Sequence, residues 1–247
     1  MHGLAPKTSV AEIPLAKRRR APHAPVVPGE SAFGCPRNFL NNRFVYVVLS
    51  PRARGLSVGV NMNPDRYCDF DCIYCEVDRS RPSGETRLDT AVMAQELERT
   101  LACVTSPEFQ ETGPYHHLPA EMLKLQHVTI SGDGEPTLAA NFAEAVREIV
   151  HVRALGKLPF FKLVLITNCS GLDRPDVQQG IKLLTRTDDV WAKLDGGTQG
   201  YLDKVNRSHG ITLEKILANI LLLGRQRPIV IQSLFPAING KEPPAEE

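Results

Sequence analysis

The chain is predicted to fold as an α/β protein whose parallel strands form a partial (β/α) barrel. Short apolar runs of strand type alternate along it with segments of helical periodicity. Strands that alternate with helices pair in parallel through right-handed crossovers. In addition, the Cys-rich and Gly-rich segments follow strand candidates. Active groups of parallel barrels lie at the carboxyl ends of their strands, so a shared site is expected at that edge.

Six segments have the pattern of strands, the first as a lead-in strand and the other five as the core of the sheet. They span residues 44–49, 56–61, 126–130, 162–167, 190–194 and 229–234. Five visible core strands predict a partial rather than an eightfold barrel.

Apolar residues three and four positions apart predict helices between the strands. Met93, Leu97 and Leu101 share one helix face, and Val104 continues it. The next helix is expected to begin at Asn141, with Glu144 completing a variant of the capping box.

Two further helices are expected in the second half of the chain. One covers residues 175–184, and the other begins after Thr212 and ends at Gly224. The stripe that this last helix should turn to the core consists of Leu213, Ile216, Leu217, Ile220 and Leu221.

Composition predicts one cytoplasmic catalytic domain. The 247 residues are 42% hydrophobic and 23% charged, with a net charge of +1, as in ordinary globular proteins. No apolar run approaches the roughly 20 residues that cross a membrane. Residues 1–34 are Pro-rich and basic and are expected to form a disordered tail, leaving 35–247 as the domain. The run Lys17 to Arg20 gives weak support for nucleic-acid contact.

Residues 67–75 hold three thiols in a single short loop. Cys68, Cys72 and Cys75 stand at spacings of four and three, which lets their sulfurs converge on one small inorganic body. A [4Fe-4S] cube on three thiolates keeps one iron open. Zinc is an alternative, but it needs a fourth ligand and His116 is far along the chain. A Cys72–Cys75 redox pair leaves Cys68 unexplained.

A second motif, residues 131–138, follows the strand candidate 126–130. Gly132 and Gly134 let the backbone approach a ligand, and their amides suit a carboxylate. The Glu135 carboxylate suits an ammonium, so the segment could hold a small zwitterion. A Gly-rich turn with a solvated acid is the alternative.

Together the two loops resemble the radical S-adenosylmethionine enzymes. Their signature is Cys-x3-Cys-x2-Cys with an aromatic residue before the last cysteine, here Tyr74, and a Gly-Gly-Glu-like segment, matched here except for Asp133. Gly59-Val60-Asn61, and Lys193-Leu194-Asp195 followed by Val205-Asn206-Arg207, are similar to the branch of wyosine-type tRNA-modifying enzymes and their bacterial relatives. The resemblance covers roughly residues 43 to 235.

The resemblance implies a barrel of the radical S-adenosylmethionine type and a [4Fe-4S] cluster on Cys68, Cys72 and Cys75. A low-potential donor such as flavodoxin or ferredoxin would reduce the cluster. Cleavage of S-adenosylmethionine would then give a 5′-deoxyadenosyl radical for hydrogen abstraction from an unknown substrate, RNA or peptide. The residues expected to contact the cofactor follow the strands: Tyr74, Gly132, Asp133, Gly134, Glu135, Asn168, Lys193, Asp195 and Gln232.

The alternative function is a non-catalytic iron–sulfur or zinc module for electron transfer or binding. Glu135 and its glycines favour the enzyme, because a redox module has no use for a methionine-binding segment.

Two departures separate the chain from the family pattern. Wyosine synthases carry a second cluster, but the remaining cysteines here, Cys35, Cys103 and Cys169, are scattered and are not expected to be ligands. Little sequence follows Leu234, so the family's last helix and sixth strand are expected to be missing and the chain to be C-terminally truncated.

Overall fold

A six-stranded sheet in the order β1-β2-β3-β4-β5-β6 organises the computed structural model, which describes residues 39–50, 53–80, 85–112, 115–116, 118–245 and 247. The strands are β1 (Val45–Ser50), β2 (Gly55–Asn61), β3 (Leu125–Ser131), β4 (Lys162–Thr167), β5 (Asp189–Lys193) and β6 (Val230–Gln232). β1 is antiparallel to β2, and every later pair is parallel. The predicted α/β class, lead-in strand and five parallel core strands are confirmed.

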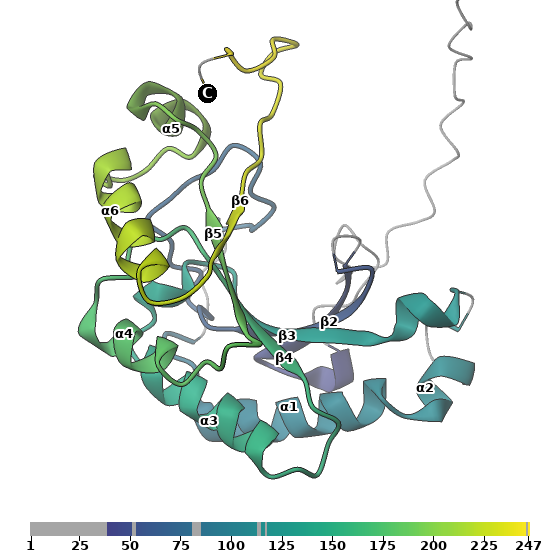
Figure 1. Ribbon diagram of the computed structural model, residues 1–247. Coiled ribbons are helices and arrows are strands. Elements are labelled where there is room, and N and C mark those ends of the chain that lie inside the picture. The colour runs from purple at the N-terminus through teal and green to yellow at the C-terminus, as the bar shows by residue number, and fades with distance from the viewer. Residues whose placement is uncertain (1–38, 51–52, 81–84, 113–114, 117, 246) are drawn as a thin grey trace, which may run out of the picture.

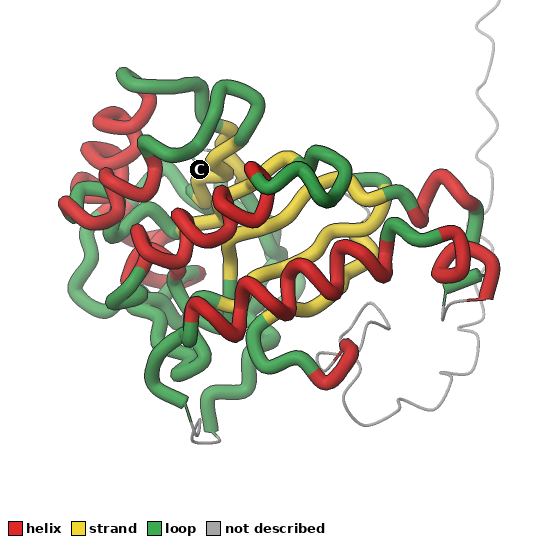
Figure 2. The backbone as a smooth tube through the Cα atoms, turned by 90° about the horizontal axis from the view of Figure 1, so that it is seen from below, coloured by secondary structure: helices red, strands yellow, loops and turns green. Residues whose placement is uncertain are grey.

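Helices follow the convex side of this curved sheet (Figures 1 and 2). They are α1 (Thr90–Val104), α2 (Pro107–Thr112), α3 (Phe142–Ala154), α4 (Pro175–Ile181), α5 (Gln199–Val205) and α6 (Leu213–Gly224). Short 3-10 turns cover Phe39–Asn41, Ala120–Leu123 and Pro136–Leu138. None of the helices in the described part of the chain is both long and apolar enough to span a bilayer.

The core lies between the sheet and the helices. Val58 and Val60 of β2 and Leu163 of β4 are fully buried, as expected of parallel strands covered on both faces. Met93, Leu97 and the rest of the predicted apolar face of α1 are buried as well, which confirms that helix. The tail predicted for residues 1–34, and Cys35, fall outside the described residues.

The predicted capping box at the start of α3 is wrong. The Asn141 side chain makes no capping bond; its Nδ2 donates to Leu88 O at 2.9 Å instead. Glu144 is held by Thr90 and Arg87, which lie in and before α1. Long-range partners therefore replace the local reciprocal bonds that the sequence pattern suggested.

The core stripe predicted for α6 is also partly wrong. Leu217 and Leu221 are exposed, whereas Asn219 is buried in their stead. The Asn219 amide donates to Cys169 O and Ser170 O at 2.7 and 3.1 Å, and these bonds turn that face of the helix inward. β6 is shorter than predicted, and among the described residues no strand pairs with its far side.

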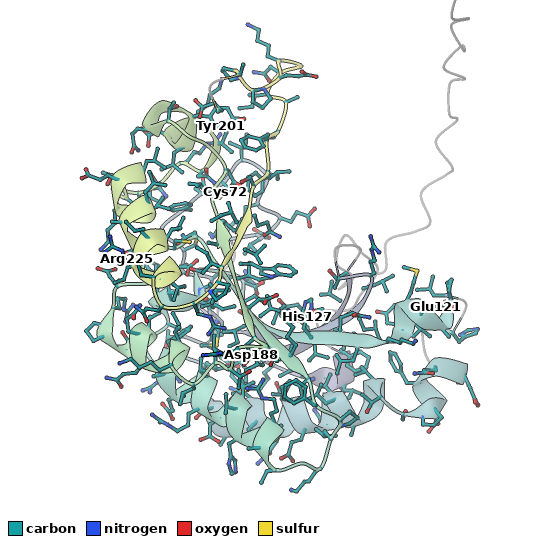
Figure 3. The ribbon with its side chains drawn as sticks, viewed as in Figure 1. Cys72, Glu121, His127, Asp188, Tyr201 and Arg225 are labelled. Atoms are coloured by element: carbon teal, nitrogen blue, oxygen red, sulfur yellow. The ribbon has the colours of Figure 1, made fainter. Side chains whose placement is uncertain are left out.

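Asp188, just before β5, holds the sheet at the end opposite to the cysteines (Figure 3). Its carboxylate accepts two bonds from the Arg153 guanidinium, at 2.7 and 3.1 Å, and others from Leu163 N and from Thr185. Both side chains of the pair are nearly inaccessible to solvent. Burial alone would raise the pKa of Asp188, but the bonds from Arg153, Leu163 and Thr185 outweigh it and lower the pKa.

Asp188→Asn is expected to lower the free energy of unfolding by about 3–5 kcal/mol, because it leaves a buried guanidinium without its carboxylate. Since the folded pKa is depressed, this stabilisation is complete above the ordinary value of 3.8 and is lost as the pH falls through the lower folded pKa. Urea unfolding at pH 7 and below pH 3.8 measures both effects. Glu144→Gln, which breaks an exposed ion pair, should cost less than about 1 kcal/mol; equal costs would contradict the assignment.

Candidate functional site

A cavity of about 430 Å³ opens at the carboxyl ends of the core strands. Its volume is in the range of small-molecule and cofactor sites. All of the residues that the sequence singled out for the cluster or the cofactor line it: Cys68, Cys72, Tyr74, Cys75, Gly132, Asp133, Gly134, Glu135, Asn168, Lys193, Asp195 and Gln232. The structure thus brings together residues from five strand ends, and their binding roles remain predictions.

The three thiols of the cysteine loop, residues 67–75, all line the cavity. Among the residues that the structure describes, no three His, Cys, Asp or Glu side chains are grouped so as to hold a single metal ion. Each thiolate of an iron–sulfur cube binds a different iron, so the three sulfurs of such a site do not need to meet at one ion. Burial raises the pKa of Cys68 to about 12, and a bound metal would have to overcome that cost to hold a thiolate.

The cysteine loop is held by the segment that ends and follows α5. Ile73 N donates to Val205 O at 2.9 Å, Asp71 N donates to Asn206 O at 3.0 Å, and His209 N donates to Asp69 O at 2.9 Å. An antiparallel bridge joins Phe70 to Ser208. The loop is therefore held by backbone hydrogen bonds of antiparallel type, and these bonds set the positions of its sulfurs.

Gly132 and Gly134 allow the turn after β3 to lie against neighbouring chain. A Cβ atom on Gly134 would be 1.8 Å from Tyr67 O, and one on Gly132 would be 2.7 Å from Asn61 Oδ1. Glu135 N donates to the same Tyr67 O at 3.0 Å. The close approach that these glycines permit is therefore to the start of the cysteine loop and to the end of β2.

Asp133, the departure from the family pattern, is paired with Asn61 at the end of β2. Asn61 Nδ2 donates to Asp133 Oδ2 at 3.0 Å, and Asp133 N donates back to Asn61 Oδ1 at 3.0 Å. An aspartate in the glycine position therefore secures the turn to the neighbouring strand.

Glu135 is buried at the end of β3 and accepts four hydrogen bonds. Oε1 accepts from Thr137 N, Thr137 Oγ1 and Thr167 Oγ1, at 3.1, 2.5 and 2.5 Å. Oε2 accepts from Asn168 N at 2.7 Å. Burial raises the pKa of Glu135, and these bonds act in the opposite direction. The carboxylate thus links the turn after β3 to the end of β4 beside the cavity. The sequence motif did not predict this structural role.

The remaining predicted residues are tied into the wall of the cavity. Asn168 Nδ2 donates to Asp69 Oδ1 at 2.7 Å, so the end of β4 contacts the cysteine loop. Lys193 Nζ lies 4.7 Å from the centroid of the Tyr74 ring, a cation–π distance. Gln232 O accepts from Leu194 N at 3.1 Å, while Gln232 also borders the cavity.

Tyr74, Asp195 and Asn206 form a polar cluster on one side of the cavity. The Tyr74 hydroxyl and the Asn206 amide both donate to Asp195 Oδ2, the latter at 2.7 Å, and Leu234 N donates to Oδ1 at 2.9 Å. Burial raises the pKa of Tyr74, and the hydrogen bond to Asp195 raises it further, so the phenol stays protonated.

Comparisons with known proteins find sequence relatives at low identity. No family model matches the chain. A UPF0026 protein of Helicobacter pylori is 26% identical over 187 residues, 73% of this chain and 52% of that protein. A UPF0026 protein of Methanocaldococcus jannaschii is 28% identical over 171 residues, 69% of this chain and 46% of that protein. The chain therefore spans about half the length of the curated relatives it matches.

The structure of TYW1 with a lysine-pyruvate adduct bound has a TM-score of 0.53 and 16% identity to this chain, covering 81% of it and 67% of TYW1. The chain has the fold of a radical S-adenosylmethionine enzyme. The resemblance to the wyosine-synthase-like branch is confirmed by these sequence relatives and this fold.

Sequence reasoning missed several residues that line this cavity, namely Glu76, Arg79, Ser131, Thr167 and Asn206. Of these, Ser131 and Thr167 end β3 and β4, so the strand-end rule could have found them. Asn206 belongs to the run Val205-Asn206-Arg207 that carried part of the resemblance. It could not be assigned to the site because α5 itself was not predicted.

Proposed function

We propose that the chain is the core of a radical S-adenosylmethionine enzyme. Cys68, Cys72 and Cys75 would hold a [4Fe-4S] cluster, and the turn Gly132 to Glu135 with Asn168, Lys193, Asp195 and Gln232 would bind S-adenosylmethionine beside it. When bound and reduced, the cluster supplies the electron that cleaves the sulfonium to methionine and a 5′-deoxyadenosyl radical, which takes hydrogen from a substrate.

The observation that carries this proposal is the single cavity shared by three thiols and a Gly-rich turn. The thiols alone would also suit an electron carrier. A carrier, however, gains nothing from a cavity of about 430 Å³ that adjoins its cluster and is walled by four other strand ends. Such a cavity would supply volume for a nucleoside and an amino acid beside a cluster held by the three cysteines.

The residues of the chain would perform binding and orientation. The amides of the Gly132 to Glu135 turn suit the carboxylate of methionine, and Asp133, Glu135 and Asp195 supply negative charge near an ammonium. Tyr74, with its ring under Lys193, would close the side of the cavity nearest the last cysteine and keep water from the reacting centre.

We propose a low-potential flavodoxin or ferredoxin as the electron donor, since reductive cleavage needs one. For the substrate we propose RNA or a peptide. The basic run Lys17 to Arg20 supports RNA, although it lies outside the described residues.

Anaerobic reconstitution with iron and sulfide, followed by dithionite and S-adenosylmethionine, tests the function. The expected products are methionine and 5′-deoxyadenosine, detected by chromatography, at equal amounts and only when reductant is present. A loaded cluster without 5′-deoxyadenosine would identify a non-catalytic iron–sulfur module. Stoichiometric zinc without iron would identify a zinc module.

A further inference from the structure

Asn206 stands at the end of α5, where the helix meets the cysteine loop. It is the C-cap of that helix, its amide N–H returns to Leu202 O, and its own carbonyl accepts from Asp71 N. Arg207 follows with a φ of 47°, in the left-handed region that often ends helices. The backbone on both sides is thus fixed, and the short Asn206 side chain is directed toward the cavity that it lines.

The Asn206 amide nitrogen faces three acceptors of the site. Nδ2 is 2.7 Å from Asp195 Oδ2, 3.3 Å from Cys72 Sγ and 3.4 Å from the Tyr74 hydroxyl oxygen. The reverse orientation of the amide would put a carbonyl oxygen against the Asp195 carboxylate. Electrostatics therefore assigns the nitrogen to this side.

The environment of the amide oxygen, Asn206 Oδ1, indicates that the contacts of Nδ2 determine the orientation of the side chain. Asn206 is 2% exposed, and its Oδ1 is buried without a hydrogen-bond partner among the described residues. A buried unpaired carbonyl is costly and uncommon in proteins. The side chain accepts that cost while it donates to Asp195 and to Cys72.

We propose that Asn206 is a positioning residue that donates an N–H···S hydrogen bond to the Cys72 thiolate and thereby raises the reduction potential of the cluster. This inference rests on the proposed function, because it requires the cluster. Reduction adds negative charge to the cluster and its thiolates, so a donor to sulfur stabilises the reduced form more than the oxidised form.

The buried Asp195 carboxylate makes this donor more important. Asp195 lines the same cavity and is 1% exposed, and a negative group beside the cluster opposes its reduction. Asn206 donates to both the carboxylate and the thiolate, so its one amide offsets charge on each. An apolar side chain there would remove this donor from both Cys72 and Asp195.

The test is the midpoint potential of the reconstituted cluster, followed by electron paramagnetic resonance in a redox titration of wild type, Asn206→Leu and Asn219→Leu. Asn219 is the matched control: it is equally buried, but it donates to Cys169 O and Ser170 O. Asn206→Leu should lower the ratio of reduced to oxidised cluster about tenfold at a given potential, which corresponds to a midpoint potential lower by about 59 mV for one electron. Asn219→Leu should lower only the melting temperature.

An unchanged potential in Asn206→Leu, or equal shifts in both variants, would overturn the proposal. If Asn206→Leu fails to hold a cluster, Asn206→Ala provides the decision: a lowered potential supports the proposal, and loss of the cluster from both variants limits Asn206 to a structural role. A wild-type chain that binds no cluster would overturn the proposed function itself, whereas a loaded wild type without the shift overturns this inference alone.

Discussion

Replacement of Cys68, Cys72 or Cys75 by alanine is expected to abolish the [4Fe-4S] signal and all formation of 5′-deoxyadenosine. Three thiolates leave one iron of a cube without a protein ligand, and the loss of one thiolate would leave two irons without one. We expect two thiolates to be too few to retain the cluster. Each single variant should bind far less than the about four iron atoms per chain of a loaded cube. Iron and sulfide analysis with electron paramagnetic resonance would measure the loss.

Cys103→Ala is the matched control for these variants, because Cys103 is a partly buried thiol of α1 that does not line the cavity. It should load iron like wild type, as should Cys35→Ala and Cys169→Ala. A cluster that survives the loss of Cys68, Cys72 or Cys75 would require another ligand and would contradict the assignment.

Glu135→Gln is expected to affect both stability and cofactor binding. An amide offers one oxygen to the four donors that now meet the carboxylate, so at least one buried donor loses its acceptor, at about 1–3 kcal/mol. Loss of the negative charge should also weaken S-adenosylmethionine binding about tenfold or more. Chemical unfolding and anaerobic calorimetry measure the two effects separately, while the cluster itself should still assemble.

Glu76→Gln is the control for Glu135, since Glu76 lines the same cavity from an exposed position. It should leave the stability within about 0.5 kcal/mol of wild type. Lowered stability with unchanged affinity in Glu135→Gln would restrict Glu135 to joining β3 and β4. No change in either quantity would show that its charge has no role.

The positions of the predicted site residues followed from local signals and one topological rule. Cys68, Cys72 and Cys75 are close in sequence, so their spacing alone indicated a shared ligand. Asn168 and Lys193 are distant from them, but parallel strands end at one edge, which brings such residues to the cavity. Apolar runs likewise predicted β2 and β4 correctly, because burial of both faces leaves continuous apolar runs, whereas the exposed β6 is shorter than predicted.

The hydrogen-bond partners could not be predicted in the same way. Glu144 has the spacing of a capping residue, yet its carboxylate accepts hydrogen bonds from Arg87 and Thr90, before and in α1. Asn219 stands in an apolar run, yet it is buried while Leu217 and Leu221 are exposed. In each case the deciding partner belongs to a distant segment of the chain. Glu135 is the functional example, since two of its four donors, Thr167 Oγ1 and Asn168 N, lie at the end of β4, about 30 residues farther along the chain.

The hydrogen bonds between the cysteine loop and the segment that ends and follows α5 set the order of chain synthesis and cluster insertion. Cys72 and Asn206 are 134 residues apart. At roughly 5–20 residues per second, a ribosome needs about 7–27 s to make the second after the first. During that interval the three thiols have no docking surface and are open to oxidation or to stray metal ions. Iron–sulfur delivery should therefore follow synthesis of α5, and a chain arrested before Asn206 should not retain the cluster.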